Sequence, residues 1–223
     1  MIDGRFLQLS DSAFPSGAFS HSFGLETAIV ERDVTDAAAV RAWISTYLEH
    51  GLATLDARAF VLGFRGAASL RDLDDVLEAS VFATDVRAAN RRLARATLDA
   101  YGAMGIVDGE IAAYRDAVAA GRTSGQHALA CMLGYRAIVA SVEDSVSGYL
   151  NAAATALAAV AARVVPLGQR DVGALLWSLR EPIAGFAHTA CAVRSIDDLS
   201  ASALECEIDA MRHSLLDARL FAS

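Results

Sequence analysis

The chain has 223 residues, of which 54% are hydrophobic and 21% are charged, and its formal net charge is −8. This composition excludes an intrinsically disordered chain and is typical of a globular protein with a sizeable core. The acidic balance also argues against a nucleic-acid-binding protein, because the phosphate backbone requires a basic face. We therefore expect one domain over residues 1–223.

The first predicted element is an N-terminal turn segment over residues 1–20 that leads into a helix. Residues 14–26 hold three phenylalanines, three serines, two glycines and Pro15 in one short stretch. Proline keeps the residue before it out of the helical region, and Gly17 can take a positive φ. A serine side chain can then cap a helix that we expect from His21 to Arg32, and the candidates are Ser20 and Ser22.

The rest of the chain is predicted to form a series of further helices. Apolar residues recur three and four positions apart, which indicates one buried face per helix, and no strand-like alternation of useful length occurs. We expect an all-α fold, a compact bundle of roughly nine to ten helices. In the first half we expect a helix capped by Thr35 or Asp36, a break at Gly51, a helix over 52–64, a helix from Ser69 and an arginine-striped helix that ends near Gly102 or Gly105. In the second half we expect helices over 106–120, from Gln126 and over 145–164, and helix starts at Asp171 and Pro182. The last helix is expected to be capped by Ser200 or Ser202, within a C-terminal helix and tail over 200–223.

The arginine stripe consists of Arg87, Arg91 and Arg95, which share one helix face because they repeat every four residues. Such a row can be a solvated face that pairs with nearby acids such as Asp85. It can also contact an anion or an acidic partner. The sequence leaves both interpretations open.

Several kinds of chemistry are excluded. Every basic side chain is arginine, so no lysine can form a Schiff base or complete a P-loop. No serine lies in a G-x-S-x-G elbow, and Ser20, His21 and Ser22 are neighbours that point in different directions on a helix. We therefore expect no enzyme activity and no catalytic residues.

Localisation follows from the cysteines and from the absence of an apparent membrane segment. Three widely spaced cysteines without a C-x-x-C pair suggest reduced thiols in the cytoplasm. Residues 1–5 lack the layout of a signal peptide, and the apolar run over 152–165 is too short to span a bilayer. We expect a cytoplasmic protein with no membrane partner.

A metal site is not predicted from the histidines. His188 and Cys191, three residues apart on an expected helix, are the best candidate pair of ligands. Two ligands do not close a site, and single imidazoles on helices are more often core or cap residues. We expect neither a metal nor a cofactor to be bound tightly by this chain.

Three segments carry a resemblance to a known family. The run Pro15-Ser16-Gly17-Ala18-Phe19-Ser20-His21-Ser22-Phe23-Gly24-Leu25-Glu26 resembles the signature L-P-x-G-x-F-S-x-S-x-G-L-E of the urease accessory protein F (UreF) family. Residues 165–169, with the sequence VPLGQ, resemble its R-L-V-P-L-G-Q stretch, and residues 213–223 resemble its closing H-E-x-x-x-S-R-L-F-x-S. The tail departs from that pattern at Ser214 and Ala218, which replace a glutamate and a serine.

The resemblance implies an all-helical scaffold without chemistry of its own. In that family the protein joins a UreD-like protein (also called UreH) and the GTPase UreG on apo-urease, where nickel is inserted in a GTP-dependent step. Nickel would then be handled by the complex, and the chain would form a homodimer. The candidates for partner binding are His213, Arg219, Leu220 and Phe221, because an arginine beside a phenylalanine suits an interface anchor; the alternative is that this tail packs on its own domain. The residues of a structural signature or interface are Pro15, Gly17, Phe19, Ser20, Ser22, Gly24, Glu26, Pro166, Gly168 and Gln169.

A different class of function stays open. An unrelated helical domain could bind a small molecule, or act as an enzyme, in a pocket around His21, Glu26 and His127. That alternative predicts a defined pocket, whereas the scaffold predicts a dependence on partner chains.

Overall fold

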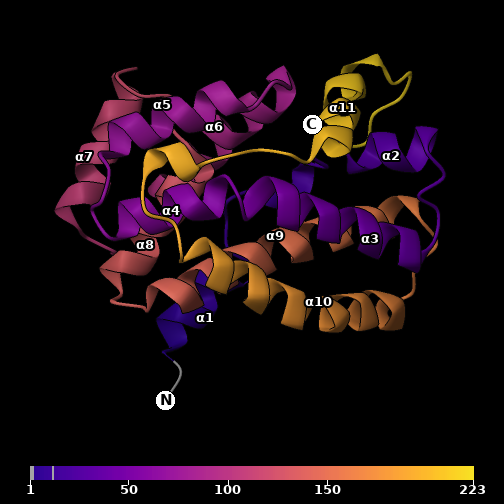
Figure 1. The fold of residues 1–223 in the computed structure, drawn as a ribbon, viewed down its shortest axis with the longest axis horizontal. Helices are drawn as coiled ribbons and strands as arrows, with labels where there is room; N and C mark the ends of the chain where they lie inside the picture. Colours follow the sequence, from indigo (N-terminus) through magenta and orange to yellow (C-terminus); the bar gives the residue numbers. More distant parts are fainter. Residues whose placement is uncertain (1–2, 12) are drawn as a thin grey trace.

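The computed structural model describes residues 3–11 and 13–223; Met1, Ile2 and Ser12 lie outside this description. The described residues form eleven α-helices and no strand, which confirms the all-α prediction with slightly more helices than expected (Figure 1). The helices are α1 (Gly4–Ser10), α2 (Leu25–Glu31), α3 (Ala37–Tyr47), α4 (Asp56–Phe64), α5 (Leu70–Ser80), α6 (Thr84–Ala103), α7 (Gly109–Ala119), α8 (His127–Ala137), α9 (Val142–Val164), α10 (Gln169–Ala190) and α11 (Leu204–Arg212). Short helical turns lie at Ala18–Ser20 (η1), Leu48–Leu52 (η2), Ile196–Asp198 (η3) and His213–Leu215 (η4).

Helix α9 is central to the bundle. It contacts α1, α2, α3, α4, α8 and α10. At 23 residues it is longer than the sequence predicts, and by length and composition alone it could cross a membrane. However, 61% of its most apolar window is buried inside the protein, as in the core helix of a globular fold. Alanines on α9 suit this position because small side chains let neighbouring helices approach closely.

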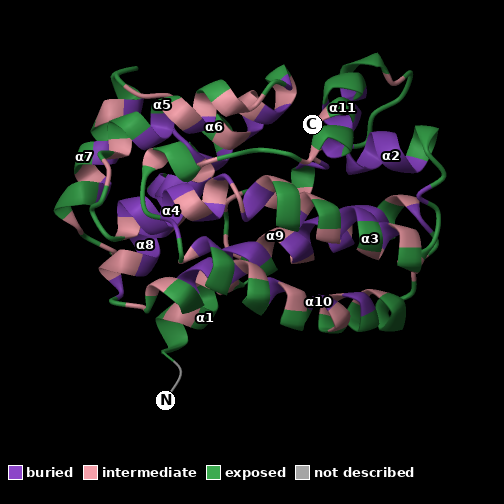
Figure 2. Cartoon of the chain, viewed as in Figure 1, coloured by how far each residue is buried: buried purple, intermediate pink, exposed green. Residues whose placement is uncertain are grey.

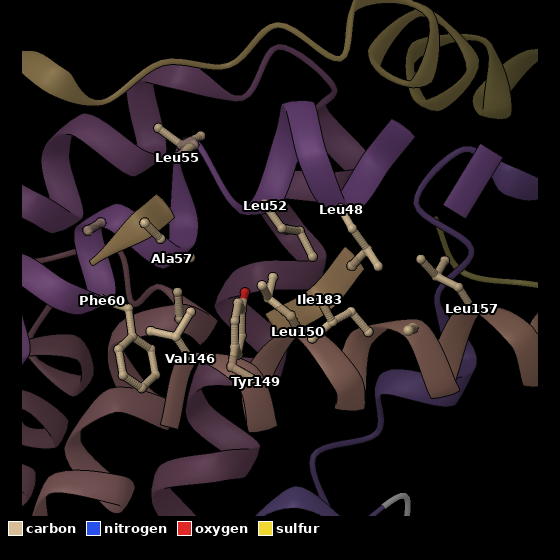
Figure 3. Packing of buried hydrophobic residues seen from close by; sticks show 14 of the residues in the cluster. Leu48, Leu52, Leu55, Ala57, Phe60, Val146, Tyr149, Leu150, Leu157 and Ile183 are labelled. Atoms are coloured by element: carbon tan, nitrogen blue, oxygen red, sulfur yellow. The ribbon is translucent and has the colours of Figure 1, made fainter. Parts of the chain in front are cut away.

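The main hydrophobic cluster joins residues from α2 to the C-terminal segment. Figure 3 shows part of it, where Leu48 and Leu52 of η2 and Phe60 of α4 lie near Leu150 of α9 and Ile183 of α10. Figure 2 shows that the buried faces of the helices point into the bundle and that α10 and α11 keep long exposed faces.

Local capping signals set several helix starts. The side chains of Asp36 and Ser69 accept hydrogen bonds from Ala39 N and Asp72 N, which confirms the predicted starts of α3 and α5. The predicted cap of the last helix is wrong. The amides of Ser200 and Ser202 instead bind the carbonyls of Thr54 and His50, and α11 starts only at Leu204.

Two predicted breaks are also wrong. Pro182 does not start a new helix but lies inside the continuous 22-residue α10. A proline costs a helical hydrogen bond, and here the buried stripe that includes Leu179 and Ile183 holds the helix together against α9. Gly51 does not end a helix abruptly either, because the chain passes through it in the π-helical turn η2. Within the predicted turn segment over 1–20, residues 4–10 form α1.

Candidate functional site

The signature over residues 14–26 forms a turn that is shaped by two glycines. Gly17 has φ +81° and Gly24 has φ +96°, so both take the left-handed conformation that glycine allows, as expected for Gly17. The capping prediction is wrong. Helix α2 starts at Leu25 with Gly24 in the cap position, and neither Ser20 nor Ser22 caps it. The Ser20 hydroxyl donates to the Gly17 carbonyl instead.

Ser22 and His21 bind the end of residues 213–223, which we call the C-terminal segment. The main-chain oxygen of Ser223 accepts hydrogen bonds from Ser22 N at 2.5 Å, Phe23 N at 3.0 Å and Ser22 Oγ at 2.5 Å. His21 Nδ1 lies 2.9 Å from Ser223 Oγ, and Ala222 N donates to Ser20 O at 2.8 Å. Burial, together with the nearby charge of Arg92, lowers the pKa of His21 to about 4, so the imidazole is neutral at pH 7.

Glu26 is the second attachment point. Its side chain is buried, and its carboxylate accepts from His213 Nε2 at 2.8 Å, from Leu220 N at 2.7 Å and from Phe221 N at 3.3 Å. A buried carboxylate requires such partners, because burying an unpaired charge is very costly. Glu26 therefore anchors both the end of α11 and the last residues of the chain.

The buried His213 lies between two carboxylates. Its Nε2 faces Glu26, and its Nδ1 is 3.9 Å from Asp85 Oδ2 on α6. The guanidinium of Arg219 lies 3.8 Å from the same Asp85 oxygen. The partner of Asp85 is thus the C-terminal segment rather than the arginine stripe of its own helix. Within that stripe, Arg87 and Arg91 pair with Glu78 of α5, which supports the interpretation as a solvated, paired face.

Arg163, at the end of α9, connects the three segments that carry the family resemblance. Its guanidinium lies over the Phe221 ring at 5.8 Å and donates to Phe19 O at 3.4 Å. Three residues later the chain turns from α9 into α10 through Pro166. Gly168 takes the cap position of α10, its amide donates to Asp171 Oδ2 at 2.9 Å, and Gln169 is the first residue of that helix.

Helix α11 has exposed residues (Figure 2), and several of these exposed side chains are large and apolar. It buries Cys206, Asp209 and Ala210 against the protein. The opposite side presents Leu204, Ile208 and Met211 of α11 and Leu215 of the following turn η4, and these four side chains are between 53% and 72% exposed. Their spacing of four, three and four residues makes one stripe. We call these four residues the α11 face.

The predicted site residues therefore have different surroundings. His213 and Phe221 are buried within the chain, so they are not available to another protein while this segment stays docked. Arg219 and Leu220 are exposed. Sequence reasoning did not link Glu26 to His213 or Arg163 to Phe221. Those pairs are 187 and 58 positions apart, and no periodicity connects them.

His21, Glu26 and His127, the residues of the alternative pocket, do not line one common cavity. His21 and Glu26 contact the C-terminal segment, whereas His127 lines a separate cavity. There the ring Nε2 of His127 lies 3.3 Å from the Cys131 thiol. His127 and Cys131 are four residues apart, so they share one helix face, and this spacing is already visible in the sequence although the pair was not predicted.

His188, which with Cys191 formed the best candidate pair of ligands in a sequence that predicts no metal site, has a carboxylate as its neighbour. His188 Nδ1 lies 3.2 Å from Glu143 Oε1 on the surface. Among the described residues, no three His, Cys, Asp or Glu side chains gather in a way that could hold a metal ion.

Comparison with known proteins gives one consistent result. The family model for UreF matches residues 34–180. The urease accessory protein UreF of Paenarthrobacter aurescens (strain TC1) is 34% identical over 216 residues, which cover 97% of this chain and 96% of that protein. The protein of the same name from Bacillus sp. (strain TB-90) is 32% identical over 97% of this chain and 96% of its own length. The one from Rhizobium meliloti (strain 1021) is 33% identical over 97% of this chain and 94% of its own length. The family model spans more than half of the chain and these relatives match 97% of it, so this chain belongs to the UreF family.

Proposed function

We propose that this chain acts in urease maturation as a non-catalytic scaffold. In this role it joins a UreD/UreH-like protein and the GTPase UreG on apo-urease, so that nickel is inserted in a GTP-dependent step. Family membership supports the link to urease, because the relatives carry the name urease accessory protein.

The observation that supports a scaffold most directly is the α11 face. Four large apolar side chains on one exposed stripe are costly in water, and contiguous apolar patches mark interaction sites. Leu220 is 73% exposed, and Arg219 lies next to it in sequence. Arginine and methionine are enriched in protein interfaces, and this surface carries Arg219 and Met211.

We assign the UreD-like protein to this surface. The docked segment supports the assignment because Glu26 and Ser22 fix the position of residues 220–223 relative to α11. A surface that is already ordered loses less conformational entropy on binding than a free tail would. His213 and Phe221 then act indirectly, by holding the segment in place, and Arg219 and Leu220 make the contact.

The remaining parts of the proposal concern the assembly. The chain works in the cytoplasm as a homodimer and binds no cofactor; the nickel ion is cargo of the complex, and UreG hydrolyses the GTP. Control of UreG comes through the assembled complex rather than through an arginine supplied to the nucleotide. Equilibrium dialysis of the isolated protein against Ni²⁺ tests the claim that this chain does not bind nickel tightly by itself. A stoichiometric site of sub-micromolar Kd would contradict that claim.

Co-expression tests the function. Apo-urease, the UreD-like protein and UreG are produced with this chain, without it, or with Ile208→Asp, and nickel-dependent urea hydrolysis is measured. We expect activity with the wild-type chain, background activity without it, and a loss of at least tenfold for Ile208→Asp. Val107→Asp is the matched control, because Val107 is exposed but lies on the turn between α6 and α7. Equal activity with and without the chain would contradict the proposal.

A further inference from the structure

A partly open cavity of about 140 Å³ lies at the meeting point of several helices. Its wall includes Leu52 and Tyr149, which Figure 3 shows beside the packed core, together with Leu157 further along α9. One part of the wall is formed by Asp11, Phe14, Ser16 and Ala18. Another part is formed by residues 80–82 together with Ala201, Ala203, Leu204, Cys206 and Glu207. Because Asp11, Phe82 and Ala201 in these segments are exposed, the cavity reaches solvent.

Size and lining limit what the cavity can hold. An apolar cavity of about 150 Å³ is large enough to bind benzene. Most of the wall is hydrocarbon, with aromatic rings from Phe14, Phe19, Phe23, Tyr135 and Tyr149. Ligand sites are typically apolar pockets with a few converging polar groups. The cavity therefore suits a single ring with few polar atoms.

Four of the polar side chains that line the cavity form two neighbouring pairs. Tyr149 donates to Asp56 Oδ1 at 3.3 Å, and the Cys131 thiol lies beside His127. The rings of His127 and Tyr149 are 6.0 Å apart between centroids, which links the two pairs.

Burial favours the uncharged forms of these groups. It raises the pKa of Asp56 to about 7 and that of Cys131 to about 12, and it lowers the pKa of His127 to about 4. Each of these directions is expected when a low-dielectric surrounding disfavours the charged state. A charged ligand would meet the same penalty, so an ion is a poor occupant and a neutral molecule is a good one.

We propose that this cavity binds a small uncharged aromatic molecule, of the size of a substituted phenol, whose hydroxyl hydrogen-bonds to the Asp56 carboxyl group. The ring lies among the phenylalanine and tyrosine side chains, and Ala153 and Ala156 of α9 leave the space that it fills. Leu204 of the α11 face also lines this cavity, whereas the other three residues of that face do not, and the proposal does not depend on the proposed role in urease maturation.

The test uses p-cresol and benzene as probes on the full chain, with calorimetry or ligand-observed NMR. We expect both to bind the wild-type protein, p-cresol more tightly than benzene. Ala156→Leu fills the cavity and should weaken both at least tenfold, while Asp56→Asn should change the preference for p-cresol over benzene. Ala184→Leu is the matched control, because Ala184 is exposed on α10.

Two results would overturn the proposal. One is an absence of saturable binding of either probe to the folded wild-type protein. The other is unchanged affinity in a folded Ala156→Leu variant, which would place the probes elsewhere. If Ala156→Leu does not fold, Ala153→Leu replaces it, since Ala153 lines the same cavity and is only half-buried. A variant that binds as tightly as the wild type contradicts the site in either case.

Discussion

The imidazole of His213 and the carboxylate of Glu26 form a buried pair, with 2.8 Å between Nε2 and Oε2 and almost no exposed surface on either side chain. The pair joins the beginning of α2 to the end of α11. The same carboxylate also accepts the amides of Leu220 and Phe221. One glutamate of the signature therefore sets the position of the C-terminal segment.

Glu26→Gln should loosen this segment. The amide keeps the shape of the side chain but removes one acceptor oxygen and the negative charge. Leaving a buried donor unpaired costs about 1–3 kcal/mol. We expect a loss of that size in the free energy of unfolding, measured by urea denaturation, and faster hydrogen exchange at the amides of residues 220–223. Glu143→Gln is the control, because Glu143 pairs with His188 on the surface. Unchanged exchange at these amides would rule out the anchoring role of Glu26.

Gly24→Ala should separate α2 from α11. A Cβ at this position would lie 2.6 Å from Ala210 N and 2.8 Å from Cys206 O, both main-chain atoms that cannot move alone. The left-handed conformation adds roughly 1–2 kcal/mol of strain. Gly17→Ala is a matched control, since its φ is also positive but no atom lies within 4 Å of the added Cβ. Thermal unfolding should show a much larger fall in Tm for Gly24→Ala, and equal falls would contradict the close packing of these helices.

Stability should depend on pH through Asp56. Its pKa is raised by burial from 3.8 to about 7, so the folded protein binds this proton more tightly than the unfolded chain does. The contribution of Asp56 to stability is therefore full below about pH 4 and is lost as the pH rises through 7. A difference of one between the folded and the unfolded pKa corresponds to about 1.4 kcal/mol, so this contribution is at most about 4 kcal/mol.

Asp56→Asn isolates this contribution. His127 titrates in the opposite sense, because its pKa is lowered to about 4 and its neutral form is favoured in the folded protein. The quantity to measure is thus the difference in unfolding free energy between Asp56→Asn and the wild type at pH 5 and at pH 8. We expect the variant to gain relative stability as the pH rises, with Asp99→Asn, on the exposed side of α6, as the control. A difference that does not change with pH would show that Asp56 is not buried in this way.

The exposed residues of the C-terminal segment should matter for binding and not for folding. Leu220→Asp changes a side chain that is 73% exposed, whereas Phe221→Ala removes a buried ring. We expect Leu220→Asp to keep the Tm within about 2 °C, in line with the small effects of surface changes, and to weaken co-purification of the UreD-like partner at least tenfold. Phe221→Ala should lower the Tm clearly. Full partner binding by Leu220→Asp would exclude this residue from the interface.

Capping residues close to a helix start predicted those parts of the fold that depend on contacts between near neighbours in the sequence. Asp36 and Ser69 cap their helices through residues three positions away, so their roles can be read from a short window. The prediction for Ser22 was wrong because its hydroxyl bonds with Ser223 rather than with its own helix, and a contact 201 positions away has no local trace. The prediction for Pro182 was wrong because tertiary packing along α10 outweighs the local cost of proline.

Only part of the candidate site could be predicted from the sequence. The resemblance marked the signature and the tail as separate segments, and the fold brings them together through Glu26 and Arg163. The spacing of the four residues in the α11 face is visible in the sequence, but helical spacing does not say whether such a stripe faces the core or solvent. The cavity could not be predicted, because it depends on how side chains from many elements pack.

Co-purification of the UreD-like protein with this chain is the most direct test of the scaffold. Wild type, Ile208→Asp and Val107→Asp are each co-expressed with the partner and compared after circular dichroism has shown that all three are folded. We predict that the partner is recovered with the wild type and with Val107→Asp, and that Ile208→Asp recovers at least tenfold less. Equal recovery with all three variants would contradict the claim that the α11 face is where this protein meets its partner.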